Sequence, residues 1–202
     1  MVDIRQSLEY ANYIKHTGWI VERVKDTNYF IKKLPLVGSF IKIQRPEFID
    51  SKTISSLTKK YEAFQIIIEP KDIVNRQWLM ANKYKQSKSP YLPSKTLYID
   101  LRQTKSELFK NLAKDARIAV EKNKKLRFRN YGNNLKEFRV SWKQTVGWKR
   151  HIPSLKNLVT LKKSFKDGSL FLLDKNTNSG AIFLVADKSS ISRQKLDGFF
   201  SF

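Results

Sequence analysis

Hydrophobic and polar positions along the first half of the chain predict short strands between helices. In "FIKIQ", residues 40–44, Ile41 and Ile43 alternate with Phe40, Lys42 and Gln44, and this period of two is typical of a half-buried strand. Three consecutive isoleucines in "FQIIIEP" predict a strand buried on both faces. The expected elements, in chain order, are a helix at 7–16, strands at 19–24, 29–34 and 40–44, a helix at 51–63, a strand at 64–70 and a helix at 75–83.

A proline- and serine-rich stretch, residues 87–95, separates this half from the next and is the best linker candidate. Thr104 and Glu107 then form a capping box, which predicts one helix over 104–123. The other expected elements of the second half are strands at 96–101 and 126–131, helices at 134–148 and 154–165, and an apolar hairpin at 169–175 and 180–187.

The order of these elements predicts the fold class. Helices and strands alternate, but without the regular rhythm of parallel βαβ units, so we expect a mixed α/β or α+β fold. Hydrophobic residues make up 41% of the 202 residues, which is enough to form a packed core.

Net charge narrows the class of partner. The formal charge is +22, and a polyanion or an anionic membrane surface would offset the self-repulsion that such a charge causes. No apolar run approaches the roughly 20 residues that a membrane-spanning helix needs. The first residues lack the apolar stretch of a signal peptide, so we expect a cytoplasmic protein.

The positive charge is concentrated in residues 102–166, which hold 19 Lys and Arg against four Asp and Glu. A helix over 104–123 would place several of these cations on one face, opposite an apolar stripe. The candidate polyanion-binding residues are Lys110, Lys114, Arg117, Lys124, Arg127 and Arg129. A solvated, lysine-rich surface is the alternative interpretation of the same pattern.

Several classes of chemistry have no motif here. The chain has no cysteine, and its two histidines lie far apart in sequence, so we expect no metal site. It has no Walker loop, no G-x-G-x-x-G, no G-x-S-x-G turn and no glycine-rich pyrophosphate loop. From spacing alone the conclusion is a basic α/β protein that binds an anion.

Two stretches resemble the FemAB (FemABX) family. The first is "YFIKKLPLVGSFIKIQRP", residues 29–46, in which "KKLPLVG" leads to "QRP". The second, residues 89–128, has the strand "PSKTLYIDL" and a capped helix that contains "LAKDAR" and ends in a lysine cluster. The opening "RQSLEYANYIKHTGW" is also similar, and the resemblance extends from about residue 4 to about residue 187.

The resemblance implies both a fold and an activity. Family members use a GNAT-type acyltransferase fold twice in tandem and transfer an amino acid from aminoacyl-tRNA to the stem peptide of a nucleotide- or lipid-linked peptidoglycan precursor. They need no cofactor, and peripheral contact with an anionic membrane surface would fit such a precursor. The rival hypotheses are a non-catalytic, basic RNA-binding protein and an acyltransferase with a small-molecule donor.

The resemblance also places candidate residues. Lys32 and Lys33, in "KKLP", are assigned to the phosphates of the precursor, with Arg45 as a weaker candidate. Arg117 matches the helix arginine of the family and is assigned to tRNA or to structural pairing. No catalytic base is nominated.

Chain length departs from the family, whose members run well beyond 300 residues. We therefore expect 1–187 to be a FemAB-like N-terminal region, with 188–202 an atypical tail left by truncation. Essential substrate contacts of the family lie in the absent half. The transferred amino acid, its position on the stem peptide and the oligomeric state stay open.

Overall fold

The computed structural model describes residues 3–88, 102–148, 150–186 and 197–201. The chain divides into two compact units, Met1–Leu97 and Tyr98–Phe202, which are called unit 1 and unit 2 and are described separately. Most of the expected linker, 87–95, lies outside the described residues, as does the strand expected at 96–101.

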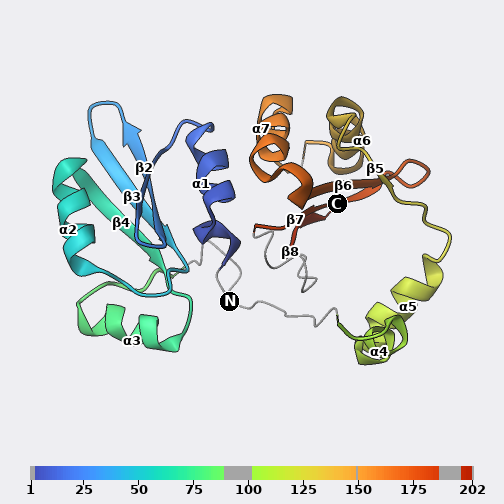
Figure 1. The fold of residues 1–202 in the computed structure, drawn as a ribbon, viewed down its shortest axis with the longest axis horizontal. Helices are drawn as coiled ribbons and strands as arrows, with labels where there is room; N and C mark the ends of the chain where they lie inside the picture. Colours follow the sequence, from blue (N-terminus) through green and yellow to red (C-terminus); the bar gives the residue numbers. More distant parts are fainter. Residues whose placement is uncertain (1–2, 89–101, 149, 187–196, 202) are drawn as a thin grey trace. The chain divides into compact units, whose positions relative to one another are not determined.

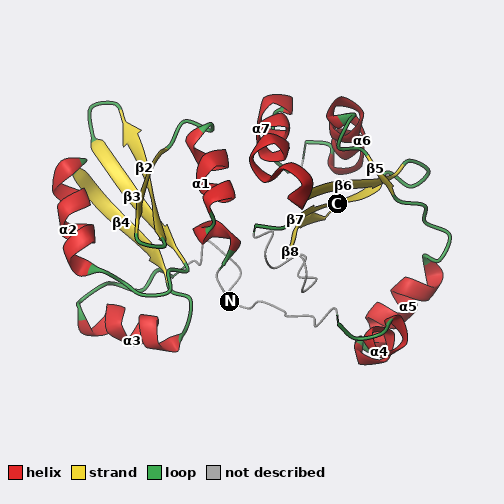
Figure 2. Cartoon of the chain, in the orientation of Figure 1, coloured by secondary structure: helices red, strands yellow, loops and turns green. Residues whose placement is uncertain are grey.

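Unit 1 is a four-stranded sheet with helices on both faces (Figures 1 and 2). Strands β1, β2 and β3 form an antiparallel meander, and β4 pairs in parallel with β3, so the sheet order is β1-β2-β3-β4. The elements are η1 (Ile4–Gln6), α1 (Leu8–Lys15), β1 (Ile20–Val24), β2 (Thr27–Leu34), β3 (Gly38–Gln44), α2 (Ser51–Lys60), β4 (Ala63–Glu69) and α3 (Ile73–Ala81).

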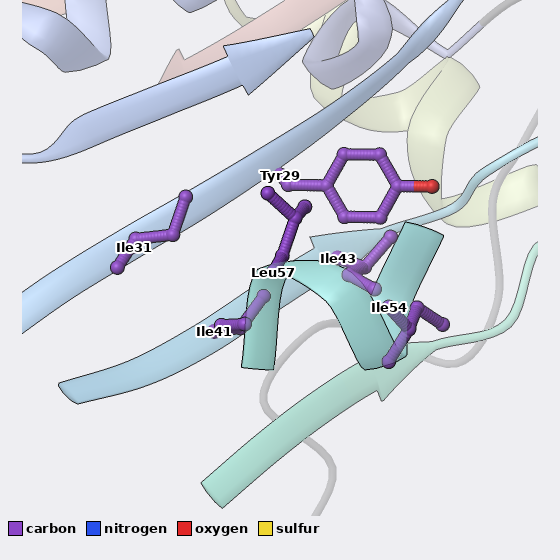
Figure 3. Close-up of a cluster of buried hydrophobic side chains, with 6 residues drawn as sticks. All are labelled: Tyr29, Ile31, Ile41, Ile43, Ile54 and Leu57. Atoms are coloured by element: carbon purple, nitrogen blue, oxygen red, sulfur yellow. The ribbon is translucent and has the colours of Figure 1, made fainter. Parts of the chain in front are cut away.

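One face of this sheet packs on α2 and forms the larger core. Its fully or almost fully buried side chains come from β2, β3 and α2, and they are Tyr29, Ile31, Ile41, Ile43, Ile54 and Leu57 (Figure 3). The period of two predicted for 40–44 is confirmed, because Ile41 and Ile43 lie on this face. The other face holds a smaller cluster in which Ala11 of α1 packs against Val21 and Phe30.

A buried polar network fixes the N-terminal segment to the end of the sheet where β2 begins and β3 ends. The side-chain oxygen of Gln6 accepts from the backbone N–H of Asn28 at 2.6 Å, and its amide nitrogen donates to the carbonyl of Gln44. Arg23 donates to the carbonyl of Gln6 at 2.6 Å and to the side chain of Asn28 at 2.8 Å. Since buried polar groups need partners, this network determines where α1 begins on the sheet.

Unit 2 also contains an antiparallel sheet, with strand order β5-β6-β7-β8. Its core lies between the sheet and two helices, where Phe138 packs edge-on against Trp142 and Phe171 at 6.1 and 5.6 Å between ring centroids. The elements are α4 (Lys105–Asn111), α5 (Lys114–Lys122), β5 (Arg129–Asn130), α6 (Leu135–Val146), α7 (Leu155–Phe165), η2 (Lys166–Gly168), β6 (Ser169–Asp174), β7 (Ser179–Leu184) and β8 (Asp197–Ser201).

Three expectations about individual elements were wrong. The single helix over 104–123 is two helices, because Leu112 and Ala113 have extended backbone (ψ 145° and 153°) between α4 and α5. The strand expected at 126–131 has only two residues, Arg129 and Asn130, paired with β6. Strand β4 lies at the edge of its sheet and is half-exposed rather than buried on both faces.

Other expectations are confirmed. Ser7 caps α1 by accepting from the backbone N–H of Tyr10 at 3.1 Å, and Thr104 and Glu107 form the predicted capping box. The apolar hairpin is present as β6 and β7, and the mixed α/β class is correct. Of the expected tail 188–202, residues 197–201 form β8, and the rest lies outside the described residues.

Candidate anion-binding site

Lys32, the first candidate cation, lies on the face of the unit 1 sheet that packs on α1. Side chains alternate along a strand, so Lys32 shares the face of Phe30, while Lys33 points to the opposite face with Ile31. Lys32 lies directly across from Phe40 in the β2–β3 ladder. The structure therefore places Lys32 beside aromatic residues and separates it from Lys33.

Lys32 is held in a defined position. Its ammonium donates to the carbonyl oxygen of Gly18 at 2.9 Å and lies 5.8 Å from the centroid of the Trp19 ring. Trp19 packs edge-on against Phe40, with ring centroids 5.3 Å apart and planes at 88°. An ammonium has three donors, and the Gly18 carbonyl uses one of them, so the group can still donate to a phosphate oxygen.

Gly18 has a role in this arrangement. Its φ of +82° lies in the left-handed region that glycine adopts at little cost, and it turns the chain from α1 toward β1. A Cβ at this position would stand 3.4 Å from the Lys32 ammonium nitrogen. Gly18 therefore both turns the chain and, through its carbonyl oxygen, positions the Lys32 ammonium.

Lys42 is the second lysine on this face, but it is paired. It lies across from Phe30 on β3, and its ammonium contacts a carboxylate oxygen of Glu69 at 3.3 Å. Gln44 donates to the other oxygen of the same carboxylate at 3.1 Å. Glu69 therefore compensates the charge of Lys42, whereas Lys32 donates to a neutral carbonyl.

Arg45 follows β3 and is tied to the N-terminal segment. It has a positive φ of 49°, its backbone N–H donates to the carbonyl of Glu69 at 2.8 Å, and its guanidinium lies 3.5 Å from the carboxylate of Asp3. Lys33 is exposed on the α2 side of the sheet. The assignment of Lys33 and Arg45 to phosphate stays a prediction. Lys33 points to the face opposite Lys32, and Arg45 follows the end of β3, five residues along the chain from Phe40, which lies across from Lys32.

The basic tract of unit 2 is exposed, but it is not one continuous helical face. Lys110 belongs to α4, Lys114 and Arg117 lie three residues apart on one face of α5, and Lys124 follows its end. Arg127 donates its backbone N–H to the carboxylate of Asp174, and Arg129 pairs with Leu173 in the β5–β6 ladder. No residue of α4 or α5 is buried, so their cations are accessible from several sides.

Hydrogen bonds lower the pKa of Asp174, the carboxylate that accepts from the backbone N–H of Arg127. The backbone N–H groups of Arg127, Asn176 and Thr177 donate to Asp174 and hold its pKa below the ordinary value. Asp174 therefore remains an acceptor that ties the start of β5 to the β6–β7 turn. Sequence reasoning did not identify this residue.

Two tyrosines of unit 1, Tyr10 and Tyr29, are not candidates for a general base. Burial is the largest cause that raises the pKa of Tyr10 and of Tyr29 to about 12, so both remain protonated at neutral pH.

Among the described residues, no three His, Asp or Glu side chains group as metal ligands would. The described helices include none long and apolar enough to cross a membrane.

Sequence reasoning also missed Trp19 and Phe40, which surround Lys32. The signal was present, since Phe40 shares its strand face with Lys42 and Gln44, and Trp19 follows the turning glycine. The pairing of β2 with β3 could not be derived from the period alone, and only that register brings Phe40 opposite Lys32.

Comparison of the whole structure with solved structures gives a match to the crystal structure of FemX, with a TM-score of 0.65 and 18% sequence identity. The match covers 90% of this chain. The chain has the fold of FemX. This match supports the fold that the resemblance implied. The chain spans 53% of the length of FemX, and the sequence matches no family model and no curated protein.

Proposed function

We propose that this chain takes part in peptidoglycan bridge formation as a FemX-like aminoacyltransferase. The amino acid would come from aminoacyl-tRNA and pass to the stem peptide of a nucleotide- or lipid-linked precursor. The observation that carries the proposal is the FemX fold over 90% of the chain, together with the ordered motifs of residues 29–46 and 89–128.

Lys32 is the residue to which we assign the precursor's diphosphate. The Gly18 carbonyl and the Trp19 ring hold the ammonium of the half-buried Lys32, so binding a phosphate would require little reordering of the side chain. Charge-assisted hydrogen bonds to phosphate are about twice as strong as neutral ones. Of the three residues that the sequence suggested for phosphate binding, Lys32, Lys33 and Arg45, we therefore retain Lys32.

The reaction needs alignment more than it needs a reactive side chain. The stem-peptide amine loses a proton and attacks the ester carbonyl, a new C–N bond forms, and the ester C–O bond to the ribose breaks. The departing ribose hydroxyl takes up a proton, so the step is balanced without an oxidant or a cofactor. The protein would accelerate it by positioning the two substrates and by stabilising the oxyanion of the tetrahedral intermediate.

Unit 2 would bind the second anionic substrate, the phosphate backbone of the tRNA. The exposed cations of the tract include Lys114 and Arg117 on one face of α5, and the RNA backbone is the polyanion that the reaction brings. The alternative, an RNA-binding protein without activity, draws on the same tract, but it gives Lys32 no role.

The aminoacyltransferase must bind a precursor as well as tRNA, whereas the RNA-binding protein needs to bind only RNA. A measurement of precursor binding in the presence of tRNA therefore distinguishes the two proposals. We expect the 202-residue chain to bind a nucleotide-linked stem-peptide precursor in isothermal titration, and to bind it still when saturated with tRNA. A chain that binds tRNA but not the precursor, in either its nucleotide- or its lipid-linked form, would support the RNA-binding alternative and contradict the transferase.

A further inference from the structure

The turn between β2 and β3 exposes an apolar tip, formed by Leu36, Val37 and Phe64. Leu36 is exposed to the full extent of an isolated residue (106%), Val37 to 63%, and Phe64, at the start of the neighbouring strand β4, to 57%. The turn lies at one end of the unit 1 sheet (Figure 1). Exposed apolar side chains that gather at one protruding place indicate a binding surface more often than isolated ones do.

The tip has a firm base. The backbone N–H of Ser39 donates to the carbonyl of Glu62 at 3.3 Å, and its hydroxyl donates to the carbonyl of Tyr61 at 2.7 Å. Gly38 has a φ of +94°, and a Cβ there would stand 2.6 Å from the Glu62 carbonyl oxygen and 3.9 Å from the Phe64 ring. These contacts join the turn to the start of β4, so the three apolar side chains form one patch.

Two exposed lysines flank the apolar tip. Lys33 is exposed next to Leu34 and lies across from Ser39, and Lys59 is in the last turn of α2, where its carbonyl accepts from the N–H of Glu62 at 3.3 Å. Lys32 lies on the other face of β2. Glu62 is the acid at the base of the tip, so Lys33, Lys59 and Glu62 together leave a net positive charge there.

We propose that the apolar tip inserts into the surface of an anionic lipid bilayer, with Lys33 and Lys59 at the level of the lipid headgroups. An apolar projection flanked by two lysines fits such a surface, because acyl chains accept the apolar side chains and anionic headgroups attract the ammonium groups. A stable protein partner buries about 800 Å² on each side. Three side chains on one turn supply far less than that area, which favours a bilayer over a second copy of the chain.

This contact does not depend on aminoacyl transfer. It would place unit 1 at the membrane surface whether the precursor is nucleotide-linked or lipid-linked, and a chain without transferase activity would still show it. The binding experiment below and the transfer assay can therefore fail independently.

The chain has no cysteine, so a single introduced thiol reports on one position. We label Val37→Cys with an environment-sensitive dye and add vesicles of phosphatidylglycerol and phosphatidylcholine in equal parts. The emission should shift to the blue on binding, whereas the same dye at Ser55→Cys, on the exposed side of α2, should not respond. A response at Ser55 alone, or no vesicle binding, overturns the proposal.

A matched pair of variants tests the energetics by vesicle cosedimentation. Leu36→Ser with Val37→Ser should weaken binding by about tenfold or more. Each substitution removes the favourable free energy of moving an apolar side chain from water into the acyl chains. The control, Ile73→Ser with Val74→Ser, changes two adjacent apolar residues that are each 68% exposed at the start of α3, and should have little effect. Equal losses in both pairs contradict insertion by the tip. A Val37 dye signal that rises with protein concentration without vesicles would identify self-association and also overturn the proposal.

Discussion

The ammonium of Lys32 lies 5.8 Å from the centre of the Trp19 ring, on the face of the sheet opposite to its neighbour Lys33. Because the two adjacent lysines lie on opposite faces, substituting each in turn tests whether the phosphate binds to the face of Lys32. Lys32→Ala should weaken binding of a nucleotide-linked precursor by about tenfold to a hundredfold, the value of a charge-assisted hydrogen bond. Lys33→Ala removes the same charge from the other face and should change the affinity by less than about twofold. Isothermal titration measures both, and equal losses would contradict the assignment.

The α5 cations can be tested through the salt dependence of RNA binding. Replacing Lys114 and Arg117 together with glutamine should reduce the slope of log affinity against log salt by about 1.5, since each lost phosphate contact contributes roughly 0.7 to 0.9. Lys136→Gln with Lys143→Gln, two exposed lysines of α6, is the charge-matched control. Filter binding of tRNA across a salt series gives both slopes. Identical slopes in the two variants would mean that α5 is not the contact.

The Gln6 network should contribute measurably to the stability of unit 1. Gln6→Ala leaves the N–H of Asn28 and the carbonyl of Gln44 without their buried partner, which should cost about 1–3 kcal/mol of unfolding free energy. Gln65→Ala, at an exposed position of β4, should cost less than about 0.5 kcal/mol. Urea unfolding followed by circular dichroism compares them. A Gln6 variant as stable as the Gln65 variant would show that the network contributes little.

Acid should weaken the contact between β1 and α2. Hydrogen bonds from Lys60, at 2.7 Å, and from the hydroxyl of Tyr61 hold the pKa of Glu22 below its ordinary value. Because the folded pKa is lowered, this contribution is present above the unfolded pKa of glutamate and is lost as pH falls through the folded pKa. Glu22→Gln should therefore flatten the acid limb of a plot of stability against pH. Glu9→Gln, at a position without an ion pair in the described part of the chain, should leave that limb unchanged.

Local patterns predicted much of the fold. The alternation around Ile41 and Ile43 identified a strand face correctly, and the capping box identified the start of α4 correctly, because both signals arise from residues close in sequence. The break between α4 and α5 could not be predicted in this way. Leu112 and Ala113 are ordinary helix formers, and neither proline nor glycine marks the interruption.

The candidate site was predictable only in part. "KKLP" directed attention to Lys32, but a consecutive lysine pair on a strand always has members on opposite faces, and only the register of β2 with β3 shows which one meets Trp19 and Phe40. The half-exposed setting of β4 was missed for a similar reason. Three isoleucines predict a buried strand, but the position of β4 at the edge of the sheet is a property of the topology.

Transfer itself is the most direct test of the account. The 202-residue chain, and any longer product of the same reading frame, is incubated with tRNA charged with radiolabelled amino acids and with nucleotide- and lipid-linked stem-peptide precursors. The account predicts label in a precursor through a bond stable to mild base, which cleaves the tRNA ester but not an amide, and a clear reduction by Lys32→Ala. If no precursor acquires label from any charged tRNA while the protein is folded and binds both substrates, the proposed aminoacyl transfer is contradicted.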